Sequence, residues 1–176
     1  RLAPYLHLSL QAGDDMILKR MKRRHSRDDA LALIAAVRGV RPDMAFGADF
    51  IAGFPTETAA MFENTVSLVD EARLSFLHVF PFSPRPGTPA ARMPPVAGGV
   101  VKDRARRLRE AGAAALVRHL DRQVGRDLTV LVEKSGTARA ADFTEIALAA
   151  DAEPGTMIRG RVTGHDGARA FLEVMP

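Results

Sequence analysis

Three short apolar strand patterns, each followed by a helical pattern, constrain the fold of the first part of this chain most strongly. The strand patterns are Tyr5–Gln11, Met44–Gly53 and Ser75–Phe82. The segments between them carry apolar residues at helical spacing on one face. Strands that alternate with helices form parallel sheets with right-handed crossovers. We therefore expect an α/β fold built on a parallel sheet.

Local signals define the helix ends between these strands. A helical pattern covers Asp14–Arg24 and follows the first strand. Ser26 is expected to start the next helix as a capping box with Asp29, three residues further on. Thr56 is expected to cap the third helix, with Glu57 in a first turn that favours negative charge.

The number of strands leaves the completeness of the sheet open. Three strands are half of a six-stranded barrel or a little less than half of an eight-stranded one, whereas a separate small sheet would leave its edges bare. The chain has 176 residues, has no initiator Met and begins just before the first strand pattern. We expect a fragment of a barrel, with parallel strands near residues 5–10, 46–52 and 76–82 and helices on one face only.

A different pattern follows a Pro/Gly-rich segment at 83–99 and a long helical pattern that ends near Gln123. From Gly125 onward, short strand patterns alternate with turn signals, which is typical of a small antiparallel β-barrel. Lys and Arg outnumber Asp and Glu by 19 to 13 over residues 1–122, whereas they are outnumbered by 8 to 6 over residues 123–176. We predict two domains with these bounds.

Composition excludes several classes of protein. Hydrophobic residues make up 47% of the chain and no apolar run approaches about 18 residues, so we expect a folded protein without a transmembrane helix. There is no Cys, which excludes a thiolate-bound iron–sulfur cluster held by these residues. His7, between two leucines, is typical of a core histidine, and the spacing of His and acidic residues predicts no metal site. Six basic residues between Lys19 and Arg27 suit a polyanionic partner or a solvated helix end.

Residues at the carboxyl ends of the strands form the candidate site, because ligands of parallel α/β folds bind there. Gln11 can donate and accept hydrogen bonds, and Asp49 suits a hydroxyl pair or an ammonium group. Gly53 lets the backbone approach a ligand, and Phe54–Pro55 would form an apolar wall. Arg85 could bind a carboxylate or a phosphate. Together these residues predict a pocket for a ligand with a flat ring, a ribose and charged ends.

Purely structural interpretations of the same residues stay open. Gln11 could cap the following turn, and Gly53 could serve the tight turn alone. Asp49 could form a structural ion pair with Arg23 or Arg24.

Three long segments carry a resemblance to a known family: "LHLSLQAGDDMILKRMKRRHS", "FGADFIAGFPTETAAMFENT" and "HVFPFSPRPGTPAARM". They resemble the radical S-adenosylmethionine methylthiotransferases that modify tRNA, above all the branch acting on N6-threonylcarbamoyladenosine. The resemblance covers essentially the whole chain. It implies the C-terminal half of the radical domain, a partial TIM-like β/α barrel, at residues 1–122 and an RNA-contacting TRAM-like barrel at residues 123–176.

The resemblance also implies cofactors and roles. The family uses S-adenosylmethionine and two 4Fe–4S clusters to form the 2-methylthio derivative of an adenosine next to the anticodon. In related radical enzymes a Gln, an Arg twelve residues later and an Asp on the next strand contact S-adenosylmethionine, and these correspond here to Gln11, Arg23 and Asp49. The cofactor-binding residues expected on this basis are Gln11, Arg23, Asp49, Gly53, Phe54, Pro55, Phe80, Ser83 and Arg85.

The implied partner is a tRNA anticodon stem-loop, and the implied location is the cytoplasm. Because the cluster cysteines are missing, we expect a fragment that holds no cofactor, does not catalyse the reaction alone and could self-associate through its open half-barrel. Competing functions are a stand-alone RNA-binding module and a barrel lyase of the aldolase kind, although the chain has no strand-end Lys for the lyase. The RNA-binding candidates are Lys19, Arg20, Lys22, Arg24, Arg126, Arg139, Arg159 and Arg161.

Overall fold

A computed structural model of the chain describes residues 2–149 and 151–175, which divide into two compact units. One unit comprises Leu6–Ala115, and the other contains the chain from Leu116 onward together with the residues before Leu6. The long helix α4, Gly98–Asp121, contributes to both units. Among the described residues, none of the helices has the length and apolarity that a bilayer crossing needs.

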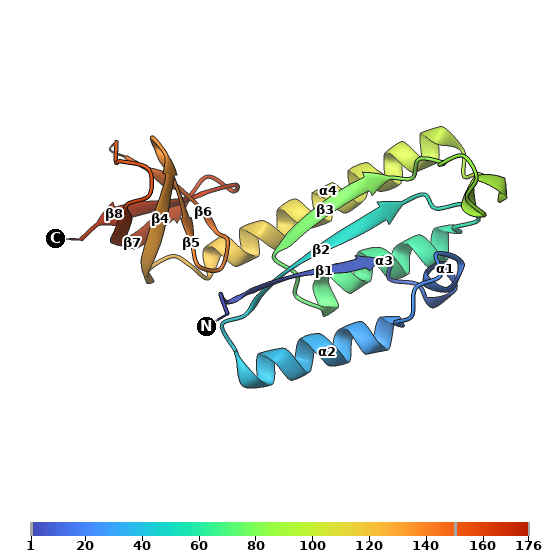
Figure 1. The fold of residues 1–176 in the computed structure, drawn as a ribbon, viewed down its shortest axis with the longest axis horizontal. Helices are drawn as coiled ribbons and strands as arrows, with labels where there is room; N and C mark the ends of the chain where they lie inside the picture. Colours follow the sequence, from blue (N-terminus) through green and yellow to red (C-terminus); the bar gives the residue numbers. More distant parts are fainter. Residues whose placement is uncertain (1, 150, 176) are drawn as a thin grey trace. The chain divides into compact units, whose positions relative to one another are not determined.

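The first unit is built on a three-stranded sheet with the order β1-β2-β3. β2 and β3 pair in parallel, with Asp49 opposite His78. Figure 1 draws all three strands pointing the same way, so the predicted parallel sheet is confirmed (Figure 1). The strands are β1 (Tyr5–Gln11), β2 (Ala45–Ala52) and β3 (Phe76–Pro81).

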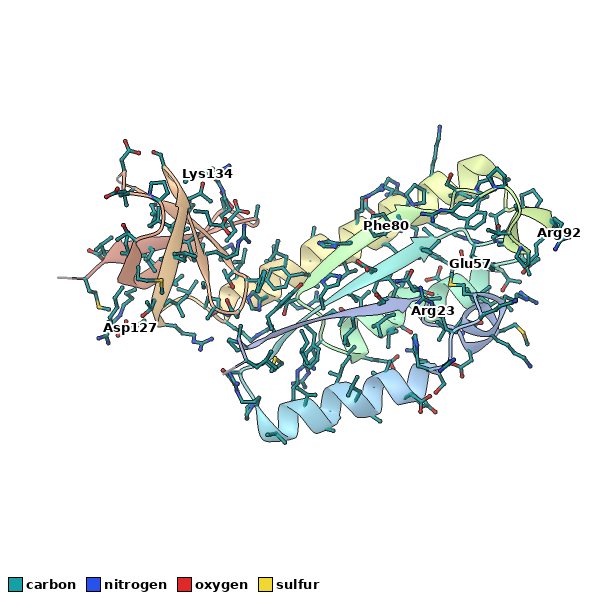
Figure 2. All side chains as sticks on the ribbon, in the orientation of Figure 1. Arg23, Glu57, Phe80, Arg92, Asp127 and Lys134 are labelled. Atoms are coloured by element: carbon teal, nitrogen blue, oxygen red, sulfur yellow. The ribbon has the colours of Figure 1, made fainter. Side chains whose placement is uncertain are left out.

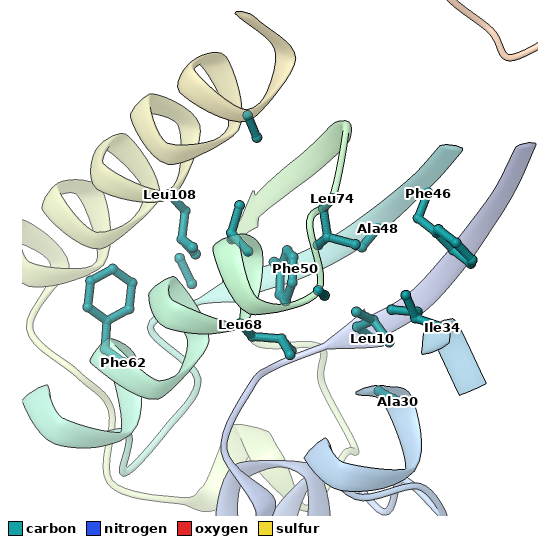
Figure 3. Close-up of a cluster of buried hydrophobic side chains, with 14 of the residues drawn as sticks. Leu10, Ala30, Ile34, Phe46, Ala48, Phe50, Phe62, Leu68, Leu74 and Leu108 are labelled. Atoms are coloured by element: carbon teal, nitrogen blue, oxygen red, sulfur yellow. The ribbon is translucent and has the colours of Figure 1, made fainter. Parts of the chain in front are cut away.

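Three helices cover one face of this sheet, as predicted. Alternate strand residues such as Leu10, Ala48 and Phe50 point into a single apolar core (Figure 3). Helices α2, α3 and α4 all contribute to the same core, for example through Ile34 and Leu108 (Figure 3). The helices of this unit are α1 (Asp15–Arg20), α2 (Arg27–Val40), α3 (Ala59–Glu71), the short 3-10 helix η1 (Ala90–Arg92) and the first part of α4.

Helix α1 is shorter than the helical pattern over residues 14–24 predicts. It ends at Arg20 because Lys22 adopts the left-handed conformation with φ +58°. The N–H of Arg23 then bonds back to the Leu18 carbonyl at 2.9 Å, a closure typical of helix C-termini. Helix α2 starts as predicted, since Ser26 forms the expected capping box.

The start of helix α3 differs from the prediction. Thr58, and not Thr56, is the N-cap, because its hydroxyl accepts the Met61 N–H at 3.2 Å. Thr56 has φ +66°, which is incompatible with the N-cap geometry predicted for it. Glu57 lies before the helix and turns inward, where its Oε2 accepts the Gly53 N–H at 3.0 Å. The chain thus needs two more residues of turn than the local pattern indicates.

The second unit contains a closed five-stranded barrel with the order β4-β5-β6-β8-β7. Its strands pair in antiparallel fashion except β6 and β8, which pair in parallel. The prediction of an antiparallel barrel is therefore wrong for this pair, because a closed ring with an odd number of strands cannot alternate in direction all the way round. Leu120 of α4 packs with Val130 and Ile146 in the barrel core. The strands are β4 (Asp127–Lys134), β5 (Thr137–Ala140), β6 (Glu145–Leu148), β7 (Met157–His165) and β8 (Ala170–Val174).

Candidate functional site

A cavity of about 550 Å³ lies along the sheet face that the helices leave uncovered. Asp49 and Ile51 of β2 and Phe80 of β3 contribute to its wall. These residues alternate with the core-facing ones along their strands, so the strand period alone brings them to one face. The volume is in the range of small-molecule pockets. The lining residues are Gln11, Asp49, Ile51, Phe80, Pro81, Phe82, Ser83, Arg85, Thr88 and Ala90.

A tight turn at the end of β1 positions Gln11 at the cavity. Gln11 adopts φ +69° and is only 7% exposed. The following residues are fixed by hydrogen bonds, since the Ala12 N–H bonds to the Leu10 carbonyl and the Gly13 N–H bonds to Thr65 Oγ1, both at 2.9 Å. The backbone turn that carries the Gln11 side chain is therefore fixed by hydrogen bonds, which suits a residue that orients a ligand.

A second turn after β3 positions Arg85. The Thr88 hydroxyl donates to the Arg85 carbonyl at 2.8 Å and accepts the Ala91 N–H at 3.3 Å. The cavity therefore combines an amide, a carboxylate and a guanidinium group with the aromatic ring of Phe80. This combination can bind a ligand that carries a ring, hydroxyl groups and charges of both signs.

Four of the predicted cofactor-binding residues do not line this cavity. Arg23 is exposed in the turn that follows α1 (Figure 2). Gly53 has φ +74°, and a Cβ added there would lie 2.6 Å from Val101 Cγ2 of α4. Phe54 is 4% exposed within an apolar cluster, and Pro55 is buried next to it. Gly53 is thus needed for the turn and for close packing against α4.

Asp49 lies between two histidines. Its Oδ1 is 2.9 Å from His7 Nε2 and 3.3 Å from His78 Nδ1. These contacts replace the ion pair with Arg23 or Arg24 that was open from the sequence. The prediction that His7 belongs to the core is wrong, because its side chain is 27% exposed on the uncovered sheet face.

The spacing of residues in the sequence predicted no group of histidines and carboxylates that could bind a metal, and this prediction is wrong for His7, Asp49 and His78. One ligand atom from each of His7, Asp49 and His78 lies within 4.8 Å of the other two. Spacing along the chain could not reveal this group, because its members come from three different strands. A signal was present in the strand period, since His7 has the same parity as Gln11 and His78 the same parity as Phe80.

A buried ion pair supports the turn between β2 and α3. Arg104 Nη1 of α4 donates to Glu57 Oε2 at 2.9 Å, and these side chains are 9% and 1% exposed. The same guanidinium nitrogen donates to the Glu57 carbonyl at 2.9 Å. Burial raises the pKa of the Glu57 carboxyl above its ordinary value, although Arg104 and the Gly53 N–H oppose the shift. This pair lies outside the cavity lining and fixes the backbone that carries Gly53.

Three of the four barrel arginines that were predicted to bind RNA have partners within the barrel unit. Arg139 pairs with Glu133 at 2.6 Å. Arg161 pairs with Asp127 at 2.7 Å across the β4–β7 ladder. Arg126 donates to Gln123 Oε1 at 2.9 Å, while Arg159 is exposed on β7. A phosphate would have to compete with the carboxylates for Arg139 and Arg161.

The basic candidates around α1 lie at its C-terminal end and in the turn that follows. Lys19, Lys22 and Arg24 are exposed, and Arg20 donates to the Thr56 carbonyl at 3.3 Å. A cluster of cations at a helix C-terminus is favoured by the helix dipole itself, so a structural reason for part of this charge exists.

Comparison with known proteins identifies relatives. Residues 2–69 match the family model described as the Radical SAM superfamily. The chain is 49% identical over 148 residues to the threonylcarbamoyladenosine tRNA methylthiotransferase MtaB of Rickettsia prowazekii (strain Madrid E), an alignment that covers 84% of this chain and 35% of the relative. This chain is a relative of the radical S-adenosylmethionine tRNA methylthiotransferases. The resemblance inferred from the sequence is confirmed.

A second curated relative and a solved structure are also similar to this methylthiotransferase relative. It is 46% identical over 140 residues to the tRNA-2-methylthio-N(6)-dimethylallyladenosine synthase of Ruegeria pomeroyi (strain ATCC 700808 / DSM 15171 / DSS-3), covering 77% of this chain and 31% of that protein. The chain thus spans about a third of the length of the curated relatives it matches. Among solved structures, the Escherichia coli radical SAM enzyme coproporphyrinogen III oxidase (HemN) matches 96% of this chain and 45% of its own, with a TM-score of 0.53 and 14% identity, a likeness of fold alone.

Proposed function

We propose that this chain is part of a tRNA methylthiotransferase that converts N6-threonylcarbamoyladenosine next to the anticodon to its 2-methylthio derivative. The observation that carries the proposal is the 49% identity over 148 residues to a relative whose name states this modified nucleoside. Because the alignment covers 35% of that relative, we assign the activity to the whole protein that contains such a chain.

The cavity on the open sheet face is the proposed site for S-adenosylmethionine, which supplies the radical and methyl chemistry when bound. The donor set fits this cofactor. The carboxylate of Asp49 suits ribose hydroxyls or the amino group, Arg85 suits the carboxylate, and Phe80 offers a ring surface to the adenine. We retain Gln11, Asp49, Phe80, Ser83 and Arg85 as proposed contacts. We propose that Gly53, Phe54 and Pro55 shape the adjacent turn. We propose that Arg23 contacts a part of S-adenosylmethionine that extends beyond the cavity.

The iron–sulfur clusters of the family do not fit the residues of this chain. Such clusters are held by Cys thiolates, and the 176 residues contain no Cys. We therefore propose that the chain alone does not cleave S-adenosylmethionine. Its residues would shape and close the pocket, while cluster ligands come from elsewhere in the whole protein.

The proposed architecture assigns residues 1–122 to the C-terminal half of a radical TIM-like barrel and residues 123–176 to a TRAM-like barrel. The parallel β1-β2-β3 sheet with helices on one face supports the first assignment. Five-stranded barrels of the OB type bind oligonucleotides, which supports an RNA-contacting role for the second. We further propose cytoplasmic action on a tRNA anticodon stem-loop. The outer edges of β1 and β3, which pair with no further strand among the described residues, and the open face favour self-association of the isolated chain. Scattering at several concentrations would reveal it.

Nucleoside analysis of tRNA tests the proposal directly. The whole protein would be expressed in a bacterial strain that lacks its own methylthiotransferases, and tRNA nucleosides would be measured by liquid chromatography and mass spectrometry. We expect the 2-methylthio form of N6-threonylcarbamoyladenosine to appear, and Asp49→Ala to abolish it. Ser9→Ala, on the same face of β1 but outside the cavity lining, is the matched control.

A second candidate substrate is N6-dimethylallyladenosine, because a relative at 46% identity is named for it. Appearance of the 2-methylthio form of that nucleoside alone would favour this candidate. Absence of both products from a well-expressed protein would contradict the enzyme proposal and favour a stand-alone RNA-binding module.

A further inference from the structure

We propose that His7, Asp49 and His78 form a binding site for one divalent transition-metal ion of the Zn²⁺ class, which this chain holds without any cysteine. The three residues come from three adjacent strands of one sheet. Asp49 Oδ1 lies 2.9 Å from His7 Nε2 and 3.3 Å from His78 Nδ1. One ligand atom from each of the three residues lies within 4.8 Å of the other two.

The distances suit a metal with short bonds. Zn²⁺ binds imidazole nitrogen and carboxylate oxygen at about 2.0–2.2 Å, so neighbouring ligand atoms of a tetrahedral site lie roughly 3.4 Å apart. The separation between Asp49 Oδ1 and His78 Nδ1 is already near this value, and that between Asp49 Oδ1 and His7 Nε2 has to widen slightly.

The backbone preorganises the ligands. Asp49 and His78 are register partners on the parallel strands β2 and β3, which fixes the distance between their Cα atoms through the ladder. The imidazole rings of His7 and His78 lie with their centroids 4.7 Å apart and an angle of 34° between their planes. Residues on strands hold a site more firmly than residues on loops.

The ligand set indicates the class of ion. Two imidazoles and a carboxylate suit Zn²⁺, Co²⁺, Ni²⁺ or Fe²⁺, whereas Mg²⁺ and Ca²⁺ prefer all-oxygen sites. Three protein ligands leave at least one coordination position for water or another molecule, as in catalytic metal sites. Asp49 also lines the cavity, so an ion bound here would lie beside the ligand that the cavity binds.

Solvent can reach the site. The side chains of His7, Asp49 and His78 are 27%, 25% and 62% exposed, so an ion can enter without unfolding. The alternative is a hydrogen-bonded group in which both rings donate to the same Asp49 oxygen. That alternative and the metal site use the same distances and differ in whether the protein binds a metal. The inference stands on this geometry and does not depend on the methylthiotransferase proposal.

Metal titration of the untagged chain tests the inference. Protein freed of metal with a chelator would be titrated with Zn²⁺ by calorimetry and with Co²⁺ by visible absorption, which reports nitrogen and oxygen ligands. We expect one ion per chain. His7→Gln and His78→Gln should each weaken binding by about tenfold or more, since loss of a direct ligand should exceed the effect of losing an outer-shell partner.

The control is His25→Gln, which removes a histidine of the same unit whose Nε2 contacts the Leu10 carbonyl at 3.3 Å. It should leave Zn²⁺ affinity within twofold of the original chain. Asp49→Asn keeps the shape of the side chain and should also weaken binding, with circular dichroism and a melting curve confirming that each variant is folded. Equal Zn²⁺ affinity in the original chain and in the folded His7→Gln/His78→Gln double variant would overturn the proposal, as would absence of Co²⁺ absorption bands.

Discussion

At the residue scale, the buried carboxylate of Glu57 in the first unit depends strongly on its cation and hydrogen-bond partners. Its Oε2 is bonded to Arg104 and to the Gly53 N–H, whereas its Oε1 is buried without a hydrogen-bond partner among the described residues. A buried carboxylate that loses its cation is left uncompensated at low dielectric, which costs more than the pair itself contributes. Stability of this unit should therefore depend on Arg104 far more than on exposed arginines.

The first prediction concerns this pair. Arg104→Ala should lower the free energy of unfolding by about 3 kcal/mol, because it leaves the buried Glu57 carboxylate without a compensating cation. The matched control is Arg107→Ala, which also removes a guanidinium stacked on Phe62 but whose partner Glu63 is 53% exposed. Urea denaturation followed by circular dichroism measures both. Equal losses in the two variants would contradict the assignment of a buried pair.

A second prediction at this scale is a pH dependence in the barrel unit. Burial alone would raise the pKa of Asp142, but hydrogen bonds from His119 and Thr144 outweigh burial and hold the pKa below its ordinary 3.8. The folded state therefore binds fewer protons than the unfolded state in this range. The stability that Asp142 contributes is present above about pH 3.8 and is lost as the pH falls through the lowered pKa.

The single tyrosine makes this measurable, because the chain has no Trp and Tyr5 stacks on Phe143 at 4.4 Å within the barrel unit. The denaturation midpoint from tyrosine fluorescence should fall as the pH is lowered below about 4. Asp142→Asn should make this decline shallower, since one low-pKa carboxyl is removed. An unchanged slope in the folded variant would show that Asp142 does not titrate as described.

At the element scale, helix α3 starts at a different N-cap residue from the one that the local sequence pattern predicts: Thr58 in place of Thr56. Thr58→Ala should cost about 1 kcal/mol, because the hydroxyl that accepts the Met61 N–H is lost. Thr56→Gly should leave stability unchanged or raise it by up to about 1 kcal/mol, because φ +66° is unfavourable for a β-branched residue. Thermal and urea unfolding of both variants test the pair. A greater loss from Thr56→Gly would restore Thr56 as the cap.

At the scale of the whole molecule, charge is distributed unevenly, and the prediction concerns RNA. The net charge of +4 arises from the basic excess over residues 1–122, since residues 123–176 have an acidic excess. Binding of the chain to an anticodon stem-loop should be electrostatic, with log affinity falling by about 0.7–0.9 per log unit of salt for each phosphate neutralised. Fluorescence anisotropy at several salt concentrations measures this slope.

Variants locate the contacts. Replacing Lys19, Lys22 and Arg24 by Gln should flatten the salt slope, because these side chains are exposed. Arg161→Gln should change it little, since Asp127 already pairs with that guanidinium. Absence of binding at low salt would remove the RNA proposal for the isolated chain.

The sequence by itself determined the elements that depend on neighbours along the chain. The apolar runs of β1 and β2, the capping box at Ser26 and the long helical pattern of α4 all follow from residues close together along the chain, and the structure has them. Five of the nine predicted cofactor contacts also line one cavity, because strand ends in a parallel sheet share an edge.

Only the tertiary structure decided the interactions between distant segments. Register between β2 and β3 places His78 opposite Asp49, and the pairing of β1 adds His7. Packing of α4 against the β2–α3 turn brings Arg104 to Glu57 and leaves room for no side chain at Gly53. Closure of five strands into a ring imposes one parallel pair. Each of these depends on which strands and helices meet in space, and residue spacing within one segment carries no record of that.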